Sequence, residues 1–358
     1  MEKTPSYDGL GLVNLVAEIE RRLTGSSLFT PLSDPSAVPD GHTIVLVLFD
    51  GLGVAQLEHP SAHPFRDSMA GTLQAGFPST TSVSLATIAT GLPPSQHGQV
   101  AHLSWYPDLQ EVVNTLKWVT INGEHVPYDY ASLLPAPNLW ERLRDSGVEP
   151  VTVQPGDFSG SPLTRALYRG ARFEGVWDPF ELADATVSLA AEPRRLVFTY
   201  VPFVDVAGHV TGQGSEEFDV AMRTAAIIWE RLLSALPPGV ALLGTADHGL
   251  IDVADGSKLL VREPKYRSVR FAGDTRGVHL WGDADLIASL TRQTGGTLID
   301  PIPMIGPGPT AESLSHLGDR LLLAPPGKAI IPKGFDKRLH CYHGGLTPEE
   351  IDIPLLVG

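Results

Sequence analysis

The chain has 358 residues and a formal net charge of −15, with 42% hydrophobic and 19% charged residues. This length and apolar content suffice for a large core, so we expect one α/β domain with an insertion. The acidic balance argues against binding to a nucleic-acid polymer, because such binding needs basic surface to neutralise phosphates. The single cysteine, Cys341, excludes an intrachain disulfide scaffold and a cysteine-rich zinc site.

The N-terminal residues lack the basic-then-apolar order of a signal peptide. The longest apolar run, Ile44 to Phe49, is far too short to cross a bilayer. We therefore expect a cytoplasmic protein without membrane contact. The sequence does not indicate an oligomeric state.

Three helices are expected from apolar spacing and capping residues. Residues 10–23 place leucine, valine and isoleucine on one side of an amphipathic helix. A second helix is expected at 138–146, where Asn138 serves as its cap, and a longer one at 215–236.

Three continuous apolar runs are typical of strands buried on both faces, as in a parallel sheet covered by helices. They occupy residues 43–49, 195–201 and 239–246, and a shorter strand is expected from residue 149. The alternation of such strands with helices predicts an α/β fold, with a mostly parallel central sheet and helices on both faces.

Two segments do not fit this alternation. Residues 99–136 are expected to form a loop or small hairpin near the site. Residues 255–335 contain short strands, a helix near 283–292 and a loop rich in proline and glycine. We interpret the second segment as a smaller cap inserted into a single domain that spans residues 1–358.

The stretch from Phe77 to Gly98 combines a proline turn, a run of hydroxyl side chains and small apolar residues up to Gly91. This pattern predicts a short helix whose N-terminus carries the hydroxyls. Unpaired N–H groups and the helix dipole favour an anion there, and we predict that Thr81 is a nucleophile toward a phosphoryl group. The alternative is that these hydroxyls only cap the helix.

Three apolar runs each lead into an aspartate: Asp50, Asp205 and Asp247. The carboxyl ends of parallel strands share one edge of the sheet, so the three carboxylates should meet in one cleft. His209 lies one helical turn after Asp205, although such a pair also occurs by chance. The ligand types suit zinc, and two zinc ions about 4 Å apart suit in-line displacement at phosphorus; other divalent ions such as Mn²⁺ remain alternatives.

Five short motifs, in this order along the chain, resemble the alkaline phosphatase superfamily and, within it, the type I phosphodiesterase/nucleotide pyrophosphatase family. The motifs are Phe-Asp50-Gly-Leu-Gly, Phe-Pro-Ser-Thr-Thr81 with the following Ala-Thr-Gly-Leu-Pro-Pro-Ser-Gln-His-Gly98, Asp205-Val-Ala-Gly-His209, Thr-Ala-Asp247-His248-Gly and His343-Gly-Gly. The ordered set spans nearly the whole chain.

The resemblance implies an alkaline-phosphatase-like fold and a hydrolase of phosphodiester or pyrophosphate bonds in small phosphate esters. It implies that Thr81 forms a phosphothreonine, which water then hydrolyses. It also implies two zinc sites: one held by Asp205, His209 and His343, the other by Asp50, Asp247 and His248 with Thr81 beside them.

The sequence departs from the family pattern near the nucleophile. Ser82 and its neighbours replace the Phe-Pro-Asn of nucleotide pyrophosphatases, and His102 stands where an asparagine usually holds a phosphate oxygen. His102, Trp105 and Tyr106 are candidates for lining a substrate pocket, although core packing explains the two aromatic residues equally well. No arginine lies close in sequence to Thr81, which favours diesters over monoesters.

Two alternatives to a phosphodiesterase remain. The first is a phosphomonoesterase, phosphonate hydrolase or phosphomutase on the same scaffold. The second is a metal-stabilised binding module without turnover, which the retention of a full ligand set and a nucleophile argues against.

Overall fold

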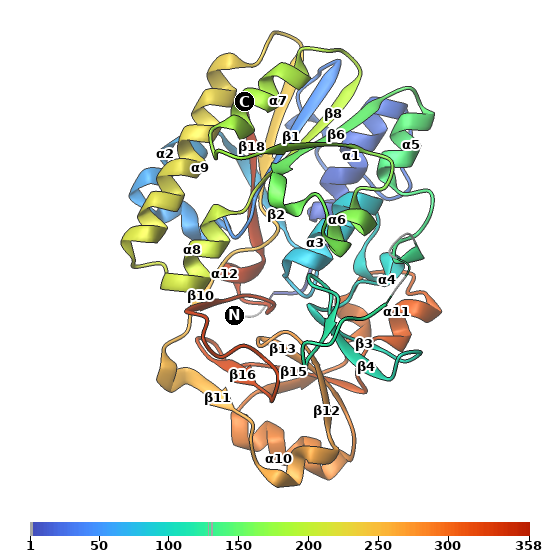
Figure 1. Cartoon of the computed structure of the whole chain (residues 1–358), viewed down its shortest axis with the longest axis vertical. Helices are drawn as coiled ribbons and strands as arrows, with labels where there is room; N and C mark the ends of the chain where they lie inside the picture. The colour runs from blue at the N-terminus through green and yellow to red at the C-terminus, as the bar shows by residue number, and fades with distance from the viewer. Residues whose placement is uncertain (1–2, 128, 130–131) are drawn as a thin grey trace.

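The computed structural model describes residues 3–127, 129 and 132–358. Two lobes lie one above the other along the long axis of the molecule (Figure 1). The larger lobe is built on a seven-stranded sheet with the strand order β2-β18-β9-β1-β8-β6-β7. The smaller lobe contains a second sheet of seven strands, in the order β14-β15-β13-β12-β3-β4-β5.

The central sheet is mostly parallel, as the apolar runs predicted. In it, β1 (Thr43–Phe49) pairs in parallel with β8 (Arg195–Val201) and with β9 (Val240–Thr245). The parallel part continues through β6 (Glu149–Pro155) to β7 (Arg172–Val176). On the other side, β18 (Asp352–Val357) runs antiparallel to both β9 and β2 (Met69–Gln74).

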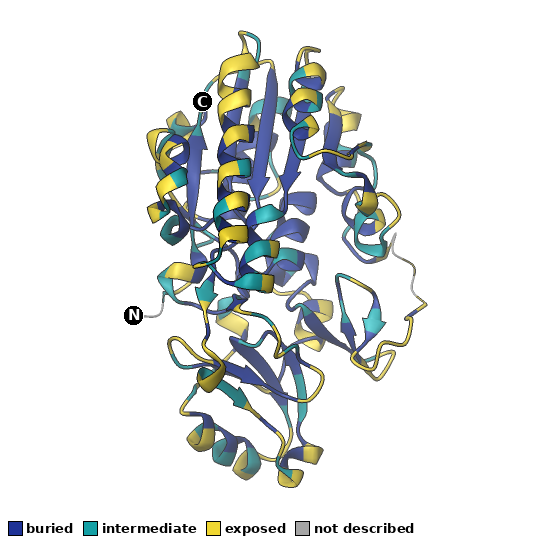
Figure 2. Cartoon of the chain, turned by 60° about the vertical axis from the view of Figure 1, so that its left-hand side comes forward, coloured by how far each residue is buried: buried dark blue, intermediate teal, exposed yellow. Residues whose placement is uncertain are grey.

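Helices cover both faces of this sheet. One layer contains α1 (Leu12–Thr24), α3 (Thr81–Thr90) and α5 (Leu139–Asp145), which contact one another. The other layer contains α7 (Glu181–Ala190) and α9 (Glu216–Ala235). Figure 2 shows that the central strands are buried, whereas the covering helices expose one face. Every residue of β1 is buried, which explains its unbroken apolar sequence.

The expected caps and helix ends are confirmed. The Asn138 side chain accepts a hydrogen bond from the backbone N–H of Glu141, and Ser215 accepts one from Phe218. Several further helices are short: α2 (His63–Asp67), α4 (Pro94–His97), α6 (Pro162–Leu167), α8 (Phe203–Thr211), α11 (Ala311–Ser315) and α12 (Pro348–Ile351). Within the described residues, no helix combines the length and apolar character needed to cross a membrane.

The smaller lobe is assembled from two segments that are far apart in the sequence. The segment 255–335 supplies β12 (Arg270–Gly273), β13 (Gly277–Trp281), β14 (Thr297–Ile299), β15 (Arg320–Leu323) and α10 (Ala284–Thr294). The segment 99–136 supplies β3 (Leu103–Tyr106), β4 (Glu111–Asn114) and β5 (Val119–Thr120). All pairings in this sheet are antiparallel, and the two segments join where Leu103 of β3 faces Gly273 of β12.

Two small strand pairs complete the connection between the lobes. In the smaller lobe, β11 (Lys258–Leu260) pairs in parallel with β16 (Ala329–Ile331). Near the larger lobe, β10 (Ile251–Asp252) pairs antiparallel with β17 (Cys341–Tyr342). The β17 strand leads directly into His343.

A buried ion pair fastens the turn between β12 and β13 to the larger lobe. Arg276 in this turn donates two hydrogen bonds to Glu350 of α12, Nε to Oε1 at 3.0 Å and Nη2 to Oε2 at 2.9 Å. Glu350 also accepts the backbone N–H of Gly345 at 2.9 Å. The pair therefore links the cap turn to the loop that carries His343.

Candidate metal centre and nucleophile

Thr81 is the first residue of α3, and Thr80 is the N-cap with extended backbone (φ −142°, ψ 148°). The helix ends at Gly91 in the left-handed conformation (φ 66°), as predicted. The Thr80 hydroxyl makes no capping hydrogen bond. The Thr81 hydroxyl instead lies 3.2 Å from Nε2 of His248, so it faces the edge of the central sheet.

One group of candidate ligands consists of Asp50, Asp247 and His248, all buried. Asp50 follows β1, and the other two follow β9, the strand that neighbours β1. Nε2 of His248 lies 3.5 Å from Oδ1 of Asp50 and 3.4 Å from Oδ2 of Asp247. One donor atom from each residue lies within 4.8 Å of the others, a spacing that one metal ion can bridge.

A second group consists of Asp205, His209 and His343. The first two lie one turn apart on α8, and Nε2 of His209 is 3.2 Å from Oδ1 of Asp205. His343 approaches the same oxygen to 4.0 Å from the loop after β17. The four-residue spacing therefore places both side chains on one helix face, as expected.

The two groups are neighbours in one cleft. The rings of His248 and His343 stack with centroids 3.7 Å apart. The backbone N–H of Asp205 donates to the carbonyl oxygen of Asp50 at 3.1 Å. The three carboxylates expected at one sheet edge do meet there, with Thr81 beside them.

Hydrogen bonds outside the cleft orient the candidate ligands. The Tyr200 hydroxyl donates to Oδ2 of Asp50. Nδ1 of His209 faces the carbonyl oxygen of Cys341 at 2.8 Å, and Nδ1 of His343 faces that of Ser79 at 3.0 Å. A carbonyl oxygen requires the proton on Nδ1, which leaves Nε2 of each ring as a lone-pair donor toward the cleft.

Each aspartate keeps one oxygen without a hydrogen-bond partner among the described residues. These buried atoms are Oδ1 of Asp50, Oδ1 of Asp205 and Oδ2 of Asp247. The other carboxylate oxygen of Asp247, Oδ1, is occupied: it accepts the backbone N–H groups of Gly51 and His248 at 3.1 and 3.0 Å. Buried carboxylate oxygens of this kind fit a divalent cation, which supplies the missing partner.

The electrostatics of the cleft agree with this fit. Burial, followed by the charges of Asp247 and Asp205, raises the pKa of Asp50 well above its usual value. Burial also raises the pKa of Asp247, and burial followed by the neighbouring imidazoles lowers the pKa of His343. Without a cation, the clustered carboxylates repel one another and their burial disfavours the charged form. A bound cation attracts the carboxylates and accepts the lone pairs of the neutral imidazoles.

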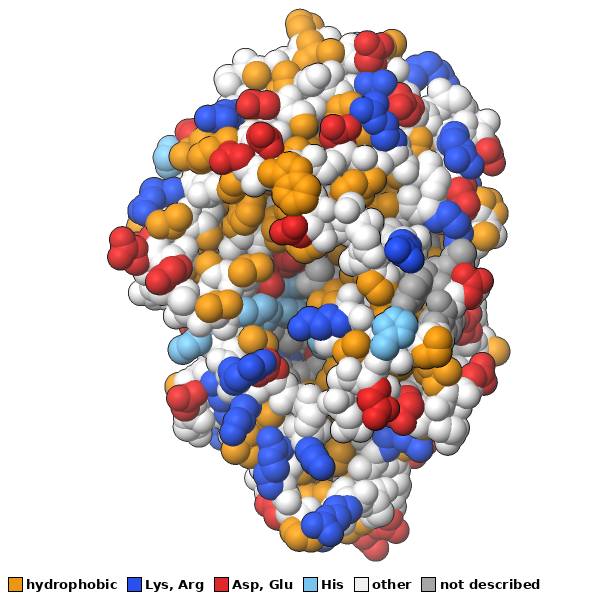
Figure 3. Space-filling view, viewed as in Figure 1, with side chains coloured by type: hydrophobic (Ala, Val, Ile, Leu, Met, Phe, Trp, Pro, Cys, Tyr) orange, Lys and Arg blue, Asp and Glu red, His pale blue; other side chains and the backbone are white. Residues whose placement is uncertain are grey.

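Two hollows open beside Thr81, and this residue lines part of both. The first has a volume of about 560 Å³ and is lined by Thr81, His209 and His343 together with residues of the smaller lobe. The second, of about 270 Å³, lies on the side of Asp50 and has apolar walls that include Phe158. Figure 3 shows histidine side chains at the hollow between the lobes.

The structure separates the three candidates for substrate contact. His102 lines the first hollow, and its Nε2 lies 3.2 Å from Nδ2 of Asn114. Trp105 and Tyr106 do not line either hollow. Trp105 is buried beneath the Arg270 guanidinium, 3.5 Å from the ring centroid, and Tyr106 is buried beside His316. Core packing, the alternative considered for these two aromatics, accounts for both.

His97, the last residue of α4, lies in the protein interior and belongs to neither group of candidate metal ligands. It is buried, with Nε2 3.1 Å from the Thr87 hydroxyl, and Nδ1 accepts the N–H of Gln99. Burial lowers its pKa to about 3, so it stays neutral.

Sequence reasoning did not identify the cap residues Asn114, Lys117 and Asp274, which also line the first hollow. Asp274 lies in the tight turn between β12 and β13, and burial raises its pKa to about 7. In the sequence, an aspartate between glycines indicates only a turn. Its position beside Thr80 depends on the packing of the two lobes.

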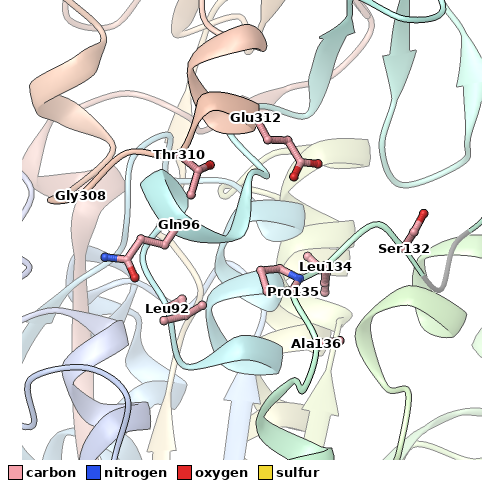
Figure 4. A pocket seen from close by; sticks show the side chains of 9 residues that line it. All are labelled: Leu92, Gln96, Ser132, Leu134, Pro135, Ala136, Gly308, Thr310 and Glu312. Atoms are coloured by element: carbon pink, nitrogen blue, oxygen red, sulfur yellow. The ribbon is translucent and has the colours of Figure 1, made fainter.

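A separate hollow of about 650 Å³ lies away from the metal ligands, between α4 and α11 (Figure 4). Its lining contains one ionisable side chain, Glu312, whose pKa is raised by burial. It contains none of the seven candidate site residues. Size alone therefore does not identify the site, whereas converging charged groups do.

A sequence model of the family described as type I phosphodiesterase/nucleotide pyrophosphatase matches residues 44–284. The chain belongs to this family. The matched region contains Thr81 and five of the six candidate metal ligands, and His343 follows it. A search of curated proteins found no match.

Solved structures show the same fold. Murine ectonucleotide pyrophosphatase/phosphodiesterase 5 is 17% identical, with a TM-score of 0.64, over 87% of this chain and 87% of that chain. The human protein of the same name is 16% identical, with a TM-score of 0.64, over 88% of this chain and 87% of that chain. Phosphonoacetate hydrolase from Sinorhizobium meliloti 1021 is 18% identical, with a TM-score of 0.65, over 89% of this chain and 91% of that chain. The α/β, alkaline-phosphatase-like fold expected from the motifs is confirmed, and the chain is a hydrolytic enzyme of this superfamily.

Proposed function

We propose that the chain is a two-zinc hydrolase of phosphodiester or pyrophosphate bonds in small phosphate esters, with Thr81 as its nucleophile. The observation that carries this proposal is the position of the Thr81 hydroxyl. It lies at a helix N-terminus, 3.2 Å from a ligand of the first group, and the second group is adjacent. The proposal is further supported by the unpartnered aspartate oxygens.

The first group would hold one zinc ion beside Thr81, and the second group would hold the other. When bound, such ions lower the pKa of a hydroxyl or water and neutralise developing negative charge. The ligand geometry divides the six residues between two positions without sharing.

The reaction has two displacements at phosphorus. Thr81 Oγ1 loses its proton and forms a bond to phosphorus as the bond to the leaving oxygen breaks, and the leaving oxygen takes up a proton. A water oxygen then bonds to phosphorus, the bond to Oγ1 breaks, and Oγ1 regains a proton. The first N–H groups of α3 would face the non-bridging phosphoryl oxygens, where the helix dipole stabilises negative charge.

Two named structures bear on this proposal. One murine relative is described as an inactive threonine-to-alanine variant in complex with AMP, which agrees with a threonine nucleophile and a phosphate ligand. The phosphonoacetate hydrolase is described in complex with phosphonoacetate, so phosphonates are the second candidate substrate class.

Turnover of matched substrates tests the proposal. Zinc-loaded protein is assayed with bis-p-nitrophenyl phosphate, p-nitrophenyl phosphate and phosphonoacetate. We expect the diester to be the best substrate, and Thr81→Ala to lower turnover roughly thousandfold while metal content stays the same. Thr81→Ser is the matched control, because it retains a hydroxyl at the helix N-terminus. Equal activity of the alanine variant and the wild type would contradict the nucleophile assignment.

A further inference from the structure

The turn between β12 and β13 brings a carboxylate from the smaller lobe into the cleft. Asp274 is 7% exposed and lines the first hollow. Its backbone N–H donates to the carbonyl oxygen of Gly277 at 2.9 Å, and the N–H of Gly277 donates back at 3.1 Å. These backbone bonds hold the turn without using the side chain, so the carboxylate can face the cleft.

Asp274 packs directly against the two segments that carry the site. A Cβ atom added to Gly344 would lie 2.6 Å from the Cβ of Asp274, and Gly344 (φ 103°) follows the candidate ligand His343. Thr80, which precedes the proposed nucleophile, lines the same hollow. On the side of the smaller lobe, Oδ2 of Asp274 accepts the N–H of His102 at 3.3 Å. The carboxylate therefore borders the space that a phosphoryl group on Thr81 would occupy.

The buried ion pair fixes this approach. Arg276, two residues after Asp274, is bound to Glu350, which also holds the N–H of Gly345. The cap turn and the His343 loop therefore move together. Above its raised pKa of about 7, the Asp274 carboxyl group therefore holds a negative charge beside the metal centre.

The charges around the first hollow determine which phosphoryl groups the Asp274 carboxylate would disfavour. Among its described lining residues, Lys117 is the one lysine or arginine. Of the three lining carboxylates, Asp205 belongs to a candidate metal group and Asp336 pairs with Arg338, whereas Asp274 does neither. Near neutral and basic pH the phosphoryl group of a monoester carries close to two negative charges, and that of a diester carries one. Repulsion between charges is stronger in a partly desolvated site than in water, so a fixed carboxylate penalises the second charge.

We propose that Asp274 is a specificity-determining residue that selects singly charged phosphoryl groups, as in diesters, over the dianion of a monoester. This inference rests on the proposed function, because selection between esters affects catalysis only if the chain hydrolyses them. The charge selection itself can be measured as binding, without turnover.

The test compares wild type, Asp274→Asn and Asp274→Glu in zinc-loaded form, at about pH 9, where carboxyl groups are ionised and inorganic phosphate is a dianion. Asn is close in shape to Asp and can accept the His102 N–H, so the turn is retained. Asp285→Asn, at an exposed position of α10, is the control that changes net charge equally. Calorimetry measures the affinity for inorganic phosphate, and kinetics measures kcat/KM for bis-p-nitrophenyl phosphate and p-nitrophenyl phosphate.

For Asp274→Asn we expect phosphate affinity to rise, and the diester-to-monoester ratio of kcat/KM to fall, each by about tenfold or more. Asp274→Glu and Asp285→Asn should keep wild-type selectivity. Unchanged phosphate affinity in Asp274→Asn overturns the inference, as does an equal loss of activity on both esters. If wild type turns over none of the substrates, the proposed function fails, yet the phosphate affinities still decide the role of Asp274.

Discussion

The two lobes contribute to the cleft in different ways. The larger lobe delivers its aspartates from strand ends and the first turn of a helix, positions that the parallel sheet brings to one edge. The smaller lobe delivers His102, Lys117 and Asp274 from turns and loops of an antiparallel sheet. The first lobe therefore fixes the chemistry that is available, and the second shapes what reaches it.

The largest expected effect comes from the larger lobe. Asp247→Asn replaces a carboxylate whose Oδ2 is buried without a partner. We expect loss of about one metal ion per chain and a roughly thousandfold or greater fall in diesterase turnover. Elemental analysis and steady-state kinetics check this, with Asp285→Asn as the control. Full metal content in Asp247→Asn would remove this residue from the ligand set.

The junction of the lobes should matter for stability. Glu350→Gln leaves the buried Arg276 guanidinium without its charge partner, and we expect a loss of about 3–5 kcal/mol in unfolding free energy. Denaturant unfolding measures this loss. Arg338→Gln is the comparison, since it breaks an exposed pair with Asp336 and should change the unfolding free energy far less. Similar losses in both variants would contradict the role of the junction.

A pH dependence separates Asp274 from an ordinary surface carboxylate. Burial raises its pKa in the folded protein from 3.8 to about 7. Between these values the unfolded chain has released a proton that the folded protein keeps, so the group lowers stability as pH rises toward 7. In metal-free protein, Asp274→Asn should be more stable than wild type by about 2–4 kcal/mol at about pH 8 and equal to it near pH 4. A pH-independent difference would contradict the burial of this carboxylate.

The smallest effect concerns Trp105, which packs in the smaller lobe against Arg270. Trp105→Phe should lower unfolding free energy by about 1 kcal/mol, because it weakens a cation–π contact. The KM for the diester should stay unchanged, whereas His102→Ala should raise it. A change of KM in Trp105→Phe would place this aromatic ring in contact with substrate.

The same contrast explains what the sequence could predict. Asp50 and Asp247 were identifiable because continuous apolar runs mark buried parallel strands, and the ends of such strands converge. A hydroxyl run before a helix that ends at glycine marked the helix N-terminus, and the resemblance to the family selected Thr81 within that run. The pairing of β3 with β12 joins segments about 170 residues apart, and no local pattern indicates it. For this reason the candidate site in the larger lobe could be predicted, whereas the position of Asp274 could not. For Trp105 the sequence left core packing and substrate contact equally open.

Metal content with activity before and after chelation tests the central claim most directly. The two ligand groups predict about two zinc ions per chain, and removal of the ions should abolish diesterase activity until zinc is restored. Less than one ion per chain with full activity would contradict the metal centre and leave Thr81 as a helix-terminal residue without a catalytic role.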